Sequence, residues 1–98
     1  MMLDRFRLDD RVVIVTGAGR GIGAAVAAGL AEAGAYVVAG ARSVDQLAET
    51  AAAVETNGRR AVTVAGDLST RDGMRALVDT AIAEFGRIDV VVNNVGGA

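Results

Sequence analysis

Glycines are concentrated in the segment Thr16–Gly23, which directly follows the apolar run Val12–Val15. Residues without a Cβ atom let an anion come close to the backbone, and N–H groups at a helix start attract it. An apolar strand, a glycine-rich turn and a helix in this order are typical of a site that binds phosphate groups. A tight turn that holds no ligand is the alternative interpretation of the same segment.

Several residue types that carry chemistry are missing from the chain of 98 residues. It contains no cysteine and no histidine, and all 10 of its basic residues are arginine. Without cysteine the sequence offers no disulfide, no thiolate nucleophile and no thiolate metal ligand. Without lysine it does not match the phosphate-binding loop of nucleotide triphosphatases, which requires one. Because cysteine and histidine, two common metal ligands, are both missing, we predict no metal site.

The overall composition is that of a small globular domain. Hydrophobic residues make up 52% of the chain and aromatic residues only 3%, which suits closely packed helices and buried strands. A formal net charge of −2 argues against nucleic acid as a partner. No apolar run approaches the roughly 18 residues of a membrane-spanning helix, so we expect no membrane partner and a cytoplasmic location.

Apolar residues mark four strands and three helices in alternation. The predicted strands are Val12–Val15, Tyr36–Ala39, Ala61–Ala65 and Ile88–Val92. The apolar positions at helical spacing are Ile22, Val26 and Leu30, then Leu47, Ala51 and Val54, then Met74, Leu77, Val78, Ala81, Ile82 and Phe85.

Polar residues and glycines mark the helix boundaries. Ser43 with Gln46, and Ser69 with Asp72, have the spacing of a capping pair, so each serine is expected to begin a helix. Glycine favours the left-handed backbone that commonly ends a helix. The expected helix ends lie at Gly34, Gly58 and Gly86.

The alternation predicts an α/β fold, a doubly wound parallel sheet of the Rossmann type with right-handed crossovers. Near-continuous valine runs indicate that helices cover both faces of the sheet. By analogy with dinucleotide-binding folds, we expect the strand order 3-2-1-4. The fourth strand would then be an apolar edge, beside a sheet face without a covering helix.

The glycine spacing resembles the T-G-x-x-x-G-x-G pattern of the short-chain dehydrogenase/reductase family. The matching residues are Thr16, Gly17, Gly21 and Gly23. Asp67-Leu68 is similar to the Asp-hydrophobic pair of the family, and Asn93-Asn94-Val95-Gly96 to its N-N-A-G, with valine replacing alanine. The resemblance covers essentially the whole chain but less than half of a typical member. We therefore expect residues 1–98 to be the N-terminal part of a single dinucleotide-binding domain, without the C-terminal catalytic half.

The resemblance implies cofactor-binding roles for specific residues. Gly17, Gly19, Gly21 and Ile22 would line the phosphates and the approach to the nicotinamide. Asp67 would accept a hydrogen bond from the adenine amino group, and Leu68 would pack beside the ring. Asn94, Val95 and Gly96 would present backbone to the adenosine ribose and the nicotinamide side. From the residues alone, Asp67 could instead bond to local backbone, and the asparagine pair could simply close a turn.

The end of the second predicted strand favours NADP(H) over NAD(H). An NAD site of this fold usually has an acidic residue there, but this chain has Ala41 followed by Arg42. Arginine pairs bidentately with a 2′-phosphate, and Arg20 in the glycine-rich turn could approach the same group. Solvated surface arginines are the alternative. Asp45 is a rival acidic candidate, but its charge suits the first turn of the next helix.

The resemblance implies an oxidoreductase that transfers a hydride between NADP(H) and a small carbonyl or alcohol substrate, homo-oligomeric at full length. The catalytic tyrosine of the family is followed four residues later by lysine, whereas Tyr36 is followed at that spacing by Gly40. We therefore predict no catalytic residue here, and a chain that binds cofactor without turnover. Two alternatives are a non-catalytic NADP(H)-binding module or partner subunit, and a methyltransferase-type domain, against which Ala41-Arg42 counts.

Overall fold

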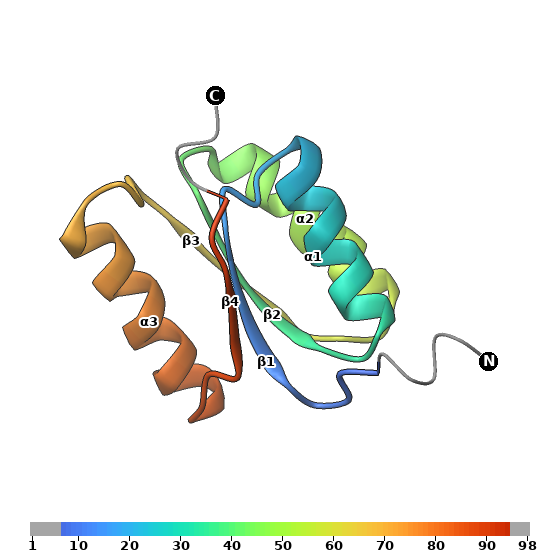
Figure 1. Ribbon diagram of the computed structural model, residues 1–98. Helices are drawn as coiled ribbons and strands as arrows, with labels where there is room; N and C mark the ends of the chain where they lie inside the picture. Colours follow the sequence, from blue (N-terminus) through green and yellow to red (C-terminus); the bar gives the residue numbers. More distant parts are fainter. Residues whose placement is uncertain (1–6, 95–98) are drawn as a thin grey trace.

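The computed structural model describes residues 7–94, which form a parallel sheet between two layers of helices (Figure 1). The strands are β1 (Val12–Thr16), β2 (Tyr36–Ala41), β3 (Ala61–Ala65) and β4 (Val90–Val92). The helices are α1 (Gly21–Glu32), α2 (Val44–Thr56) and α3 (Arg71–Phe85). Helices α1 and α2 cover one face of the sheet and α3 covers the other.

The strand order is β3-β2-β1-β4 and every pairing is parallel, which confirms the predicted doubly wound topology. β1 is the central element, because Ile14 lies opposite Val38 of β2 on one side and Val91 of β4 on the other. Val13 and Val15 face α1 and α2, whereas Val12 and Ile14 face α3. All other elements are therefore positioned relative to β1.

Two strands are longer than predicted and one is shorter. β1 extends to Thr16 and β2 to Ala41, whereas β4 begins at Val90 rather than Ile88. The side chain of Asp89 accepts the N–H of Val12, so regular pairing between β1 and β4 starts only at Val13 and Val90. No helix within residues 7–94 is long and apolar enough to cross a membrane.

α1 does not bury the apolar face that its spacing predicts. Its buried residues are Gly23, Ala27 and Ala31. Ile22, expected on the buried face, is instead 76% exposed, and Val26 and Leu30 are half-buried. The backbone of α1 lies so close to the sheet that only small side chains fit beneath it, which hydrophobic spacing alone does not reveal.

The caps of α2 are as predicted, but α3 begins one residue later than expected. The Ser43 hydroxyl accepts a hydrogen bond from Gln46 N at 3.2 Å. The N-cap of α3 is Thr70, because Ser69 instead donates its N–H and hydroxyl to the carboxylate of Asp67. Gly86 has φ 74° and ends α3 as predicted.

Apolar side chains remain exposed on α3 and β4. Val78 and Ile82 of α3 were expected on a buried face but are exposed, since only Leu77 and Ala81 of this helix are buried. On β4, Val90 is 40% and Val91 50% exposed. The expectation of an apolar edge strand beside a sheet face without a covering helix is therefore confirmed.

α1 meets the end of β1 with almost no space between the two backbones. A Cβ atom on Gly23 would lie 2.0 Å from the carbonyl oxygen of Gly17. Gly17 itself has φ +64°, a conformation that glycine adopts without strain. Glycine is thus required at position 23 by a tertiary contact, and at position 17 by the backbone.

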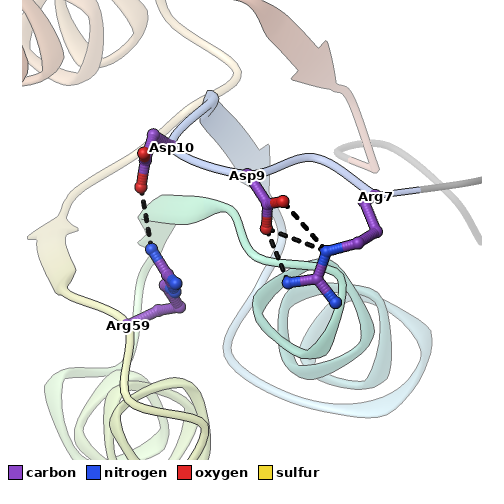
Figure 2. A network of polar contacts seen from close by, with 4 residues as sticks. All are labelled: Arg7, Asp9, Asp10 and Arg59. Atoms are coloured by element: carbon purple, nitrogen blue, oxygen red, sulfur yellow. Dashed lines mark hydrogen bonds and ion pairs between the residues drawn. The ribbon is translucent and has the colours of Figure 1, made fainter. Parts of the chain in front are cut away.

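Ion pairs hold the segment before β1 at the amino end of the sheet. Figure 2 shows Arg7 paired with Asp9 and, separately, Arg59 paired with Asp10 at 2.9 Å. The hydrogen bond from Arg7 holds the pKa of Asp9 below its usual value. These charges lie before β1 and β3, away from the glycine-rich turn at the carboxyl end of β1. The Arg59–Asp10 pair links the segments before β3 and β1, whereas Arg7 and Asp9 belong to one segment.

A second ionic anchor joins the beginnings of β1 and β4. The carboxylate of Asp89 accepts hydrogen bonds from Val12 N at 2.8 Å, Arg87 Nη2 at 2.6 Å and Arg11 Nη1 at 3.4 Å. Its side chain is only 15% exposed. The contact with Arg87, followed by the Val12 N–H, holds the pKa of Asp89 below its usual value. The charged form of Asp89 therefore stabilises the pairing of these strands.

We predict that Gly23→Ala lowers the free energy of unfolding by about 3 kcal/mol, because the added methyl group overlaps backbone that cannot move aside. The matched control is Gly29→Ala on the same helix, where a Cβ atom would meet nothing within 4 Å. Alanine there should be neutral or stabilising by up to about 1 kcal/mol, from its higher helix propensity. Denaturant unfolding of the full chain measures both variants, and equal effects would contradict the proposed contact.

We also predict that Asp89 contributes to the loss of folding stability at low pH. A carboxyl whose pKa is lowered by folding stabilises the protein above the unfolded value of 3.8, and that stability is lost as the pH falls through the lowered value. Asp89→Asn should lower the unfolding midpoint at pH 7 and give a shallower decline below pH 4 or so. Asp79→Asn, on the exposed surface of α3, is the control. An unchanged acid decline in Asp89→Asn would refute the assignment.

Candidate functional site

A cavity of about 530 Å³ opens at the carboxyl ends of the strands, next to the glycine-rich turn. Its lining residues are Gly17, Gly19, Arg20, Ala41, Arg42, Ser43, Gln46, Gly66, Leu68 and Asn94. These residues follow β1, β2, β3 and β4, so all four strands contribute to one site. In open α/β sheets this edge is where ligands bind, beside the point at which the strand order reverses.

The glycine-rich turn leaves room for a ligand at the start of α1. Arg20 is the N-cap in an extended conformation, and its side chain makes no capping hydrogen bond. By contrast, Ser43 caps α2 and Thr70 caps α3. The first N–H groups of α1 therefore have no side-chain acceptor, and its first turn contains no acidic residue. This end of the helix is suited to an anion.

Two glycines of the turn lie close to neighbouring residues. A Cβ atom on Gly17 would lie 3.0 Å from the carbonyl oxygen of Asn94, and one on Gly19 would lie 2.9 Å from Gln46 Oε1. The turn is thus enclosed by the segment after β4 on one side and by α2 on the other. Gly21 has φ +61°, but neither it nor Ile22 lines the cavity.

Thr16 connects the turn to the segment after β4. Its side chain is fully buried, and its hydroxyl donates to Asn93 Oδ1 at 2.8 Å. The hydroxyl oxygen of Thr16 also accepts a hydrogen bond from Asn94 N, at 2.8 Å. These two bonds place Asn94 beside Gly17 in the cavity wall. The predicted site residues Val95 and Gly96 lie outside the described residues.

The segment after β3 supplies a charged and an apolar group. Leu68 is buried and lines the cavity, whereas Asp67 lies at its margin and is not a lining residue. Hydrogen bonds from Ser69, and then the nearby Arg42, lower the pKa of Asp67. The bond from Ser69 N is the local backbone contact that the sequence left open as an alternative role for Asp67.

Two arginines give the cavity a positive margin. Arg20 and Arg42 both line it, and both are exposed. Arg42 is 79% exposed and lies 3.3 Å from Asp67, measured from Nη2 to Oδ1. Such an exposed pair is weak, so an anionic ligand could draw the guanidinium away from the carboxylate.

Four lining residues were not predicted as site residues, and one of them is Ala41 at the end of β2. Ser43 and Gln46 were interpreted only as a helix cap, which they are, and Gly66 follows β3. Their place in the cavity follows from the parallel sheet, which brings the end of each strand to the same edge. The residues directly after each predicted strand could therefore have been predicted to line the cavity.

Tyr36 lies at the opposite end of the sheet, at the start of β2. Its ring stacks on Phe85 with 5.3 Å between centroids, and the guanidinium of Arg59 lies over it. Within residues 7–94 there is also no group of three side chains that could hold a metal ion. The described arrangement can therefore bind an anionic ligand, and it brings no acid or base to the cavity except Asp67 at its margin.

Sequence comparisons place these features in a known family. A family model described as short chain dehydrogenase matches residues 11–98. An uncharacterized oxidoreductase of Mycobacterium tuberculosis is 48% identical over 97 residues, which are 99% of this chain and 37% of that protein. The 2-dehydro-3-deoxy-D-gluconate 5-dehydrogenase of Escherichia coli is 45% identical over 96 residues, covering 98% of this chain and 37% of the relative.

Solved structures show the same fold. L-Sorbose reductase from Gluconobacter frateurii, complexed with NADPH and L-sorbose, is 39% identical with a TM-score of 0.88, covering 93% of this chain and 35% of that one. Carveol dehydrogenase from Mycobacterium avium, in complex with NAD, is 31% identical with a TM-score of 0.86. The match covers 92% of this chain and 37% of that one. The chain thus spans little more than a third of the length of these relatives. On the family match and these identities, the chain belongs to the short-chain dehydrogenase/reductase family.

Proposed function

We propose that this chain binds NADP(H) as the cofactor-binding part of an oxidoreductase that acts on a small carbonyl or alcohol substrate. The observation that carries the proposal is the cavity at the carboxyl end of the sheet, where an uncapped helix start meets two arginines. A bound dinucleotide would supply the hydride to a carbonyl or accept it from an alcohol. The proposal extends to a cytoplasmic, homo-oligomeric full-length protein, as the family resemblance implies.

The residues of the cavity suit the parts of a dinucleotide. The backbone at Gly17 and Gly19 and the start of α1 would hold the diphosphate, since residues without a Cβ atom let an anion come close and the first N–H groups of the helix attract it. Leu68 would pack against the adenine ring, and the carboxylate of Asp67 would accept a hydrogen bond from the adenine amino group. Outside the described cavity, the approach to the nicotinamide would be lined by Gly21, Ile22 and the backbone of the segment from Asn94 to Gly96, as the family resemblance implies.

The proposed preference for NADP(H) over NAD(H) rests on Arg42 and Arg20. Where an NAD site usually carries a carboxylate, β2 ends in Ala41, so no acidic group there would repel a 2′-phosphate. Arg42 follows directly and is bound to Asp67 in a weak exposed pair. Because related structures hold NADPH in one case and NAD in another, the choice depends on these residues and not on the relatives.

We predict that Arg42→Gln weakens NADPH binding by about 10- to 100-fold, because a charge-assisted hydrogen bond to phosphate contributes about 1.5–3 kcal/mol. NADH binding should change less than about threefold, since NADH lacks the 2′-phosphate. Thermal unfolding of the full chain, with NADPH and NADH titrated separately, measures both affinities. Arg75→Gln, an exposed arginine on α3 outside the cavity, is the matched control.

Equal losses for the two cofactors would contradict the role of Arg42, and so would an unchanged affinity for NADPH. A wild-type transition that rises with NADPH more than with NADH would support the proposed cofactor. Cofactor binding by a chain that is stable alone, as a monomer or a closed dimer, would favour the non-catalytic module instead.

A further inference from the structure

A buried hydroxyl on α2 contacts the glycine-rich turn from behind. The hydroxyl of Thr50 donates to the carbonyl oxygen of Ala18 at 2.7 Å, and its side chain is only 3% exposed. In the part of the chain that the structure describes, Thr50 and Thr16 are the buried polar side chains. Thr16 holds the segment after β4, so Thr50 is the one that holds the turn from the α2 side.

The contact completes the pairing of Ala18. The N–H of this fully buried residue donates to the carbonyl oxygen of Gly40 in β2 at 3.0 Å. Its carbonyl group is bonded by Thr50. The middle of the turn is therefore attached to the sheet on one side and to a helix on the other, through a residue 32 positions away in the sequence.

The orientation of the next peptide group depends on this bond. The carbonyl of Ala18 and the N–H of Gly19 belong to one planar peptide unit and point in opposite directions. Holding the carbonyl toward Thr50 therefore fixes where the Gly19 N–H points. Gly19 lines the cavity, and its N–H has no hydrogen-bond partner among residues 7–94.

α2 touches the turn at a second point. Gln46 lies four residues before Thr50, so both side chains are on the same face of the helix. A Cβ atom on Gly19 would lie 2.9 Å from Gln46 Oε1. The helix begins directly after Arg42 and Ser43, both of which line the cavity. α2 thus connects the glycine-rich turn to the arginine at the cavity margin.

We propose that Thr50 is a positioning residue, whose hydrogen bond fixes the Ala18–Gly19 peptide in the orientation that binds the cofactor diphosphate. This role of Thr50 rests on the proposed function, because the ligand is a dinucleotide. It does not depend on the choice between NADP(H) and NAD(H). A side chain of the same shape without the hydroxyl would leave the Ala18 carbonyl buried and unpaired, which frees the peptide to reorient.

The test compares Thr50→Val, which removes the hydroxyl, with Thr50→Ser, which keeps it. Thr56→Val is the matched control, because the Thr56 hydroxyl donates to Ala52 O of its own helix on the exposed side of α2. Ligands are ADP-ribose, which contains the diphosphate, and 2′-AMP, which does not. Amide hydrogen exchange across the turn is measured on the full chain without ligand.

For Thr50→Val we expect about tenfold weaker binding of ADP-ribose, with 2′-AMP affinity within about twofold of wild type. Exchange at residues 18–21 should accelerate more than exchange in the core strands. Thr50→Ser should restore ADP-ribose affinity to within about threefold, and Thr56→Val should match wild type.

Equal losses for both ligands, with faster exchange throughout the protein, would mean a general structural role and overturn the proposal. Unchanged exchange at the turn and unchanged ADP-ribose affinity would overturn it too. A wild-type protein that binds ADP-ribose but does not prefer NADPH would refute only the proposed cofactor choice. If it binds no dinucleotide, the proposed function fails, and the assignment of Thr50 to the diphosphate fails with it, whatever the exchange at the turn shows.

Discussion

The backbone of α1 packs directly on the backbone of the turn after β1, because Gly23 places no side chain between them. This contact determines the geometry of the site. It brings the start of α1 to the end of the central strand, where Arg20 leaves the first N–H groups without a side-chain acceptor. β1 pairs with β2 on one side and β4 on the other, so the remaining cavity walls are placed relative to the same strand.

The two ends of the sheet are stabilised by different kinds of polar contact. At the amino end, Asp89 and Asp10 are paired with arginines before β4 and β1. Figure 2 shows the pair of Asp10 with Arg59. At the carboxyl end, the buried hydroxyls of Thr16 and Thr50 hold the cavity walls without adding charge. A site for an anion benefits from this division, since among residues 7–94 Asp67 is the one acidic group that we find at its margin.

The fold was predictable because its signals are local. Valine runs, helix caps and glycines at helix ends mark the elements, and alternation of strand and helix leaves few topologies for a parallel sheet. The errors come from contacts between elements. Ile22 is exposed because α1 approaches the sheet too closely for its side chain, and Ser69 does not cap α3 because Asp67 binds it. Spacing along one segment contains neither fact.

The site was predictable to the extent that its residues belong to a motif. Gly19 and Asn94 lie in the cavity as the motifs imply, whereas Thr50 contacts a residue 32 positions away and no local pattern indicates it. Ser43 shows a third case, since it both caps α2 and lines the cavity. In a parallel sheet every strand ends at the same edge, so the residue that begins the next helix is brought there as well. For this fold, a capping residue after a strand is therefore also a candidate cavity residue, and a purely local role does not argue against a place in the site.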